Sequence, residues 1–218
     1  TSAAVFIAIS LIALDDGNKK VVMLSIDNIG IAKVYYEEFK KTICEKVGLK
    51  RDELFMHCIH THTGPALRPV AGEEALKMVE TYKDFVIGRC VDVANFALND
   101  LKPAKMGYGV AQAPNIAFIR RYRMKDGSVK TNPGVLNPDI LHPIGEIDDT
   151  VNVIRFDREG AETIVLVNFG CHPDTVGGNL ISGDWPTLTR HFVEKSIDNT
   201  KCIFFNGAQG DVNHVDVH

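Results

Sequence analysis

Two histidines lie close together near the end of an apolar segment: His60 and His62, within residues 55–65. The first half of this segment is rich in strand-forming residues and a Gly-Pro pair closes it, which predicts a buried strand that runs into a turn. Side chains alternate along a strand, so His60 and His62 are expected on one face and His57 on the other. Two imidazoles on one face suit a Zn²⁺ ion, and hydrogen bonding within the fold is an equally good use of the same spacing.

A third histidine, His172, also follows an apolar run, at residues 163–169. A buried histidine held by a backbone carbonyl is the ordinary interpretation, but a second histidine at a strand end favours a metal ligand. A glycine-rich segment, residues 207–213, follows the last expected strand and contributes Asp211 and Asn213. Because strand ends gather at one edge of an α/β sheet, we expect these polar turns to surround one cleft.

Carboxylates and thiols offer further chemistry. Asp184 precedes a helical segment, so it is expected to cap that helix first and to approach a metal second. Asp211 lies in a glycine-rich turn, where local hydrogen bonding and a role in the site are equally good interpretations. Cys171 or Cys58 could serve as a nucleophile beside a histidine, although no thiol-hydrolase signature surrounds either residue.

Basic residues cluster in one place, residues 120–130, which predicts a solvated hairpin, an anion-recognising loop or both. Alternation along a strand places Arg121 and Arg123 on one face and Arg120 on the other. Only one of these sets can therefore face the cleft.

Hydrophobic periodicity predicts a single domain, residues 1–218, with an α/β fold: mixed sheets with flanking helices in a layered sandwich. Besides the histidine strand, strands are expected at residues 3–14, 20–27, 105–113, 116–124, 151–156, 163–169 and 201–206. Helices are expected at residues 31–47, 73–101 and 184–195, and a long ordered loop at residues 131–146.

The composition is that of an ordinary globular protein, with 45% hydrophobic and 24% charged residues among 218. A net charge of -4 argues against nucleic acid as a partner. The apolar run at residues 3–14 is too short to span a bilayer, so no transmembrane segment is expected. The five dispersed cysteines predict reduced thiols and a cytoplasmic location, but a removed signal peptide and secretion stay open because the chain does not begin with Met.

Several short motifs occur in a recognisable order: His-Thr-His-Thr-Gly-Pro at residues 60–65, Arg120, the strand-end His172, Ile-Ser-Gly-Asp at residues 181–184, and the Gly-Asp-Val-Asn turn ending at Asn213. In this order they resemble the catalytic domain of the neutral, non-lysosomal ceramidase family. The His-Thr-His-Ser/Thr-Gly-Pro motif is the most specific of them, and the resemblance spans most of the chain.

The resemblance implies a zinc amidohydrolase in which His60 and His172 bind the metal, His62 assists proton transfer or polarises the amide, and Arg120 holds the substrate. Asp184, Asp211, Asn213 and Arg121 are further candidates for contact with these residues or the substrate. In the family, a carboxylate and a tyrosine complete the zinc site. They come from beyond the position matching residue 218, and a glycine-rich segment precedes the position matching Thr1. The expectation is therefore a catalytic domain that is incomplete at both ends relative to the family.

The function expected from this resemblance is hydrolysis of ceramide, or of a smaller linear N-acyl amide, by a zinc-activated water. Two alternatives remain open at the level of sequence. One is a catalytically inactive metal- or ligand-binding module of the same fold, and the other is a cysteine-dependent hydrolase.

Overall fold

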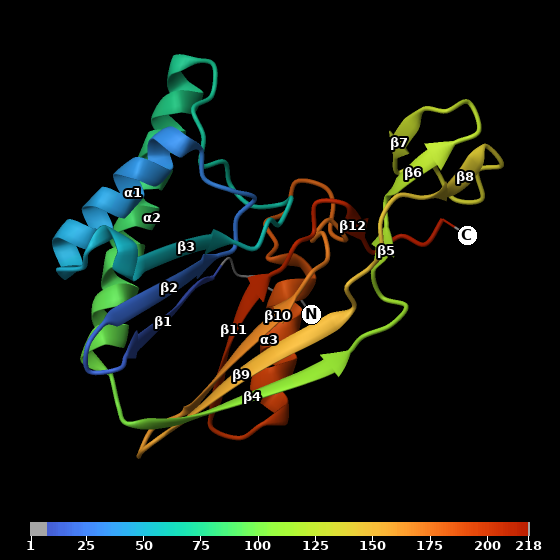
Figure 1. Ribbon diagram of the computed structural model, residues 1–218. Helices are drawn as coiled ribbons and strands as arrows, with labels where there is room; N and C mark the ends of the chain where they lie inside the picture. Colours follow the sequence, from blue (N-terminus) through green and yellow to red (C-terminus); the bar gives the residue numbers. More distant parts are fainter. Residues whose placement is uncertain (1–7, 218) are drawn as a thin grey trace.

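Two β-sheets pack face to face, with helices covering both outer sides, in a computed structural model that describes residues 8–217 (Figure 1). The arrangement is a mixed α/β fold, as the sequence predicted. The first part of the strand expected at residues 3–14 lies outside the described residues.

The first sheet has the order β1-β2-β3. Strands β1 (Ile9–Asp15) and β2 (Lys20–Ile26) form an antiparallel hairpin, and β3 (Leu54–Cys58) pairs with β2 in parallel. Alternate side chains of β2, such as Val22 and Leu24, are fully buried under the helices. Met23 points the other way, into a smaller core between the two sheets. Because both faces of β2 are covered, the strand is apolar along most of its length.

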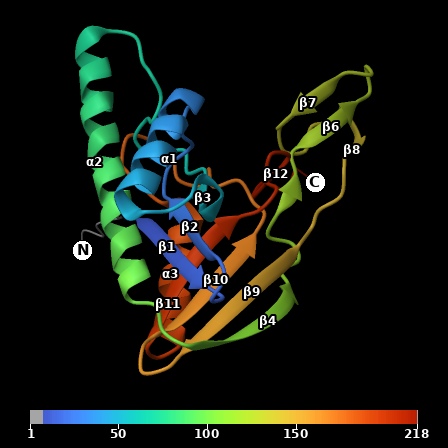
Figure 2. The same cartoon turned by 60° about the vertical axis from the view of Figure 1, so that its left-hand side comes forward.

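Helices α1 (Lys33–Val47) and α2 (Glu73–Asn99) cover the outer face of this sheet (Figure 2). A short 3₁₀ turn, η1 (Arg51–Glu53), leads from α1 into β3. Gly48 ends α1 in the left-handed conformation, at φ 75°, and its N–H donates to the Cys44 carbonyl, as a glycine after a helix is expected to do. Among residues 8–217, neither helix is long and apolar enough to cross a membrane, nor is any other.

The second sheet has the order β11-β10-β9-β4. Its strands are β4 (Ala104–Gln112), β9 (Thr150–Arg158), β10 (Thr163–Phe169) and β11 (Thr200–Asn206), and helix α3 (Asp184–Ser196) packs against β11. Strands β10 and β11 are parallel, so their carboxyl ends lie side by side. This edge is where the candidate site forms.

The segment from residue 116 to residue 146 differs from expectation. The strand predicted at residues 116–124 is two strands, β5 (Phe118–Ile119) and β6 (Arg121–Met124), which are separated at Arg120. The predicted loop at residues 131–146 contains β8 (Ile140–Pro143), which pairs with β6 on the side opposite β7 (Val129–Thr131).

Local pairing explains both corrections. The Arg120 N–H donates to the Asp211 carbonyl, next to the pairing of β5 with β12 (Val212–Asn213), whereas the Arg120 carbonyl accepts the Asn132 N–H, next to the pairing of β6 with β7, so the chain changes partner at Arg120. Strand β8 contributes Ile140 to a small core with Tyr122 and Met124. The resulting three-stranded sheet projects away from the two main sheets (Figure 2).

Candidate metal centre

Three histidines converge at the carboxyl ends of β3 and β10: His60, His62 and His172. One ring nitrogen from each lies within 4.8 Å of the other two. The Nε2 atoms of His62 and His172 are 3.0 Å apart. Two tetrahedral ligands at about 2.0 Å from one ion are roughly 3.3 Å apart, so this separation has the scale of a shared metal.

The route by which His60 reaches the cluster differs from the strand alternation predicted above. Strand β3 ends at Cys58, and His60 has a φ of 75°, a conformation that is uncommon for a residue with a side chain. Two hydrogen bonds to the loop after β2 hold His60 in place. Its backbone N–H donates to the Asn28 carbonyl at 2.9 Å, and its ring Nδ1 lies 2.7 Å from the Ile29 carbonyl. A carbonyl can only accept, so Nδ1 carries the proton and Nε2 is left as a lone-pair donor.

His172 is held in the same way from the opposite sheet. Its Nδ1 lies 3.1 Å from the Gln209 carbonyl, so Nδ1 carries the proton and Nε2, which faces His62, keeps a lone pair that could bind a metal. Burial lowers the pKa of this imidazole, the hydrogen bond to the Gln209 carbonyl opposes that shift, and the positive charge of Arg120 lowers the pKa further. This shift favours the neutral imidazole, which is the form that binds a metal.

The turn that carries His62 is tied to two other loops. The His62 N–H donates to the Pro173 carbonyl at 3.3 Å. The hydroxyls of Thr61 and Thr63 both donate to the Ser182 carbonyl, at 2.7 and 3.1 Å. His62 is nevertheless the most exposed of the three histidines, whereas His172 is buried. The cluster is thus closed on the His172 side and open on the His62 side.

Asp184 organises the loop that follows His172 rather than capping the helix. Gly183 is the residue before α3, and no side chain caps that end of the helix. The buried Asp184 carboxylate instead accepts hydrogen bonds from the Thr175 hydroxyl, from the Val176 N–H and from the N–H of the following residue. It is not part of the histidine group found among the described residues.

The Arg120 side chain is held beside the segment that follows β11. Its Nε and Nη2 both donate to the Gly210 carbonyl, at 3.0 and 2.6 Å, which fixes the plane of the guanidinium. Arg121 is exposed, and Arg123 donates to the Gly127 carbonyl within its own hairpin. The alternation expected from the sequence does not apply here, because Arg120 lies between β5 and β6 and not within one continuous strand.

Asp211 bonds to Arg120 through its backbone, whereas Asn213 forms hydrogen bonds through its side chain. The Asp211 carbonyl accepts the N–H of Arg120. Asn213 is buried, donates to the Asn132 side chain at 2.9 Å and accepts the N–H of Val215 at 3.1 Å. Neither residue belongs to the histidine group among residues 8–217.

His57 has a structural role that the sequence did not reveal. The Asn206 N–H donates to its Nε2 at 3.2 Å, so Nδ1 carries the proton and donates to the Ser25 hydroxyl at 3.1 Å. Ser25 in turn donates to the Phe204 carbonyl. Burial is the main cause that lowers the pKa of His57 to about 4.

Because of the low pKa of His57, we expect the folded protein to lose stability against unfolding in acid. His57 ionises near pH 6.5 when unfolded and at about 4 when folded, so the unfolded chain binds the extra proton between these values. Above pH 6.5 protonation of His57 does not affect the free energy of unfolding. As the pH falls from 6.5 toward 4, this free energy decreases by about 3 kcal/mol in total. Urea unfolding of the wild type and of His57→Gln at pH 7 and pH 4.5 measures this, and the variant should lose less.

The exposed His191 on α3 provides the matched control, because His191→Gln also removes one imidazole. This variant should show the same pH dependence as the wild type. Equal pH dependence in His57→Gln and the wild type would contradict the assignment.

The cysteines are poor nucleophiles. Burial raises the pKa of Cys58 to about 12 and that of Cys171 to about 11. All five thiols are free, and each is buried or half-buried. They are the reduced, inert side chains that the sequence predicted, and the geometry does not favour a cysteine-dependent hydrolase.

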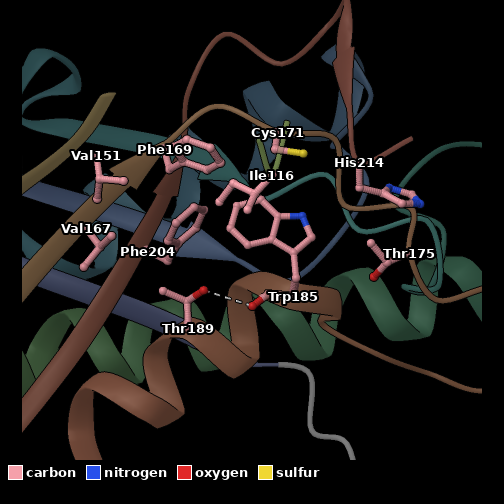
Figure 3. Close-up of a pocket in the computed structure, with 10 residues that line it drawn as sticks. All are labelled: Ile116, Val151, Val167, Phe169, Cys171, Thr175, Trp185, Thr189, Phe204 and His214. Carbon is pink, nitrogen blue, oxygen red and sulfur yellow. Dashed lines mark hydrogen bonds between the residues drawn. The ribbon is translucent and has the colours of Figure 1, made fainter. Parts of the chain in front are cut away.

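A separate apolar cavity of about 380 Å³ lies behind Cys171, between β10, β11 and α3 (Figure 3). Trp185 and Phe169 are among the residues that line it, and His214 and Thr175 lie together on one side. None of the three clustered histidines lines it, nor does Arg120. The cavity is therefore not part of the candidate metal centre.

Comparison with known proteins gives a likeness of fold. No protein-family model and no curated protein matches the sequence. Solved structures do match, among them a ceramidase complexed with C2, at 18% identity and a TM-score of 0.68, and a neutral ceramidase from Pseudomonas aeruginosa, at 15% identity and a TM-score of 0.66. The alignments cover 91% and 90% of this chain but 31% and 32% of those proteins. The chain thus has the fold of about one third of a ceramidase, and at these identities the likeness is one of fold.

Proposed function

We propose that this chain carries the zinc-binding part of the catalytic domain of a ceramidase-like hydrolase, which cleaves a linear N-acyl amide. One observation carries the proposal: the rings of His60 and His172 each have Nδ1 against a backbone carbonyl, so both present Nε2 to one point beside His62. The likeness of fold to two ceramidases supports the same class of substrate.

The donor set suits zinc. Neutral imidazoles fixed by a hydrogen bond at the second ring nitrogen are the usual histidine ligands of Zn²⁺, and a ring nitrogen of His60 lies within 4.8 Å of one of His172. When bound, zinc would lower the pKa of a water molecule toward about 7 and polarise the amide carbonyl. By the resemblance described above, His60 and His172 are the ligands.

His62 and Arg120 would act on the substrate. His62 is exposed on the open side of the cluster, so its Nε2 can hold or deliver a proton at the leaving amine. The contacts of Arg120 with Gly210 leave its Nη1 without a partner among the described residues. A guanidinium fixed in this way can donate to a hydroxyl or carbonyl oxygen of the substrate and orient it.

The proposal is tested by hydrolysis assays on the protein encoded by the full reading frame to which this chain belongs. We expect cleavage of a neutral N-acyl sphingoid in preference to a short N-acylated acid, because the single arginine at the site suits a polar neutral group. A zinc chelator should abolish the activity, and added Zn²⁺ should restore it.

Two results would count against the proposal. Activity that survives complete removal of zinc would exclude the metal-dependent mechanism. A preference for the acid would indicate an amidase for anionic substrates, in which Arg121 or Arg123 also faces the substrate.

A further inference from the structure

Asn206 lies where the two histidine-bearing segments meet. It is the last residue of β11, beside the carboxyl end of β10. Its side-chain Nδ2 donates to the Ile59 carbonyl at 2.9 Å and to the Cys171 carbonyl at 3.1 Å. Its Oδ1 accepts the Cys171 N–H at 3.3 Å. One amide therefore bonds to the residue just before His60 and to the residue just before His172.

The backbone of Asn206 joins the same two sheets. Its N–H donates to Nε2 of His57, which belongs to β3. Asn206 thus contacts both segments through four hydrogen bonds. No other single side chain among the described residues bonds to the backbone of both histidine-bearing strand ends.

Close approach of the backbone allows this arrangement. A Cβ on Gly207 would lie 3.2 Å from the Gly170 Cα, and one on Gly170 would lie 3.1 Å from the Ala208 carbonyl oxygen. These two glycines let the ends of β10 and β11 come together, and the Asn206 amide then reaches Cys171.

The chemistry of the side chain is specific. The position needs two donors and one acceptor at the end of a short stem, which an asparagine amide supplies. Aspartate has the same shape, but its oxygens would face the carbonyls of Ile59 and Cys171 with no proton to donate.

We propose that Asn206 is a positioning residue that sets the separation of His60 and His172, and so sets the affinity of the metal centre. This inference rests on the proposed function, in that those two histidines are taken as the zinc ligands. Asn206 itself is not expected to touch metal or substrate.

The test compares Asn206→Asp with a matched control, Asn168→Asp. Asn168 is also half-buried, one strand away on β10, and its Nδ2 also donates to a carbonyl of β11, that of Phe205 at 2.9 Å. Both substitutions exchange the same donor for an oxygen, but only Asn206 contacts the residues before His60 and His172. If Asn206 only stabilises the fold, both variants should have a lower melting temperature, and their zinc affinities should equal each other.

We expect Asn206→Asp to weaken zinc binding at least tenfold, on the scale of the roughly 10- to 100-fold loss when a group that orients a ligand is removed. Asn168→Asp should stay within about twofold of the wild type. Zinc affinity is measured by competition with a chromogenic chelator, and the melting temperature by circular dichroism. Equal affinities in Asn206→Asp and Asn168→Asp would overturn the inference.

A second variant and a metal-free measurement keep the inference separate from the proposed function. Asn206→Ser keeps one small donor and replaces Asn206→Asp if that variant does not fold; an intermediate loss of affinity is expected. If the wild type binds no zinc, the proposed metal site fails. The positioning role is then decided by the imidazole ¹H–¹⁵N spectrum of the metal-free protein. In this spectrum the Nδ1–H signals of His60 and His172 should change in Asn206→Asp and persist in Asn168→Asp, and unchanged signals would refute the role.

Discussion

Replacing His172 with alanine is expected to abolish tight zinc binding and, with it, hydrolysis. The ring is buried, neutral and oriented by the Gln209 carbonyl, so it contributes a fixed lone pair that water in the vacated space replaces poorly. Loss of a ligand should cost more than the roughly 10- to 100-fold in metal affinity that loss of an outer hydrogen-bond partner costs. Equilibrium dialysis with zinc measures the affinity, and the same preparation is assayed for turnover.

His62→Ala is the matched variant, since it removes the third imidazole of the same cluster. Because His62 lies on the open side, we expect it to act on protons rather than to hold the metal, so turnover should fall by about 10² to 10⁴ while zinc remains bound. If His62→Ala loses zinc as completely as His172→Ala, all three histidines are ligands. The 3.0 Å separation of the two Nε2 atoms would then be that of two ligands of one ion.

The sequence was sufficient to predict the layers and most of the elements. Where one face of a strand or helix is buried, as in β2 and α1, the periodicity follows the packing directly, and the predicted limits lie within about two residues of those observed. It was misleading where pairing depends on distant segments. Strand β8 was expected to be loop because only its contact with β6 makes it a strand.

The candidate site shows the same division. The histidine turn and His172 were identified from residue types and strand ends, and the structure brings these three imidazoles together. The reason given for the position of His60 was wrong, because a left-handed residue and not strand alternation turns its ring inward. The partners that orient the rings, Ile29 and Gln209, act through backbone carbonyls, which carry no signal of residue type.

The sequence did not identify Asn206, for a different reason. An asparagine at the end of a strand and before a glycine resembles an ordinary turn residue in sequence. Its role becomes visible only when the ends of β3 and β10 are known to lie on either side of it. Sequence patterns therefore locate residues that bear chemistry better than residues that hold them in place.

Arg190→Ala is expected to cause the largest loss of folding stability. Arg190 on α3 forms a two-pronged ion pair with Asp27 at the end of β2, with distances of 2.8 and 2.5 Å, and Asp27 is completely buried. Removing the arginine leaves a buried carboxylate whose remaining donors are neutral groups, among them the Thr187 hydroxyl at 3.1 Å. Loss of one partner from such a pair costs about 3 to 5 kcal/mol, which urea unfolding would measure.

Two further variants separate the buried charge from the general effect of losing an arginine. Arg89→Ala removes an exposed pair with Asp92 on α2 and should cost no more than about 1 kcal/mol. The double variant Asp27→Asn with Arg190→Met removes both charges together and should recover much of the stability, since the penalty comes from an unpaired buried ion. If the double variant is as unstable as Arg190→Ala, packing and not charge is the cause.

The ion pair between Arg190 and Asp27 also has a consequence for the site. Asp27 precedes Asn28 and Ile29, whose carbonyls hold His60, so Arg190→Ala should also weaken zinc binding, whereas Arg89→Ala should not.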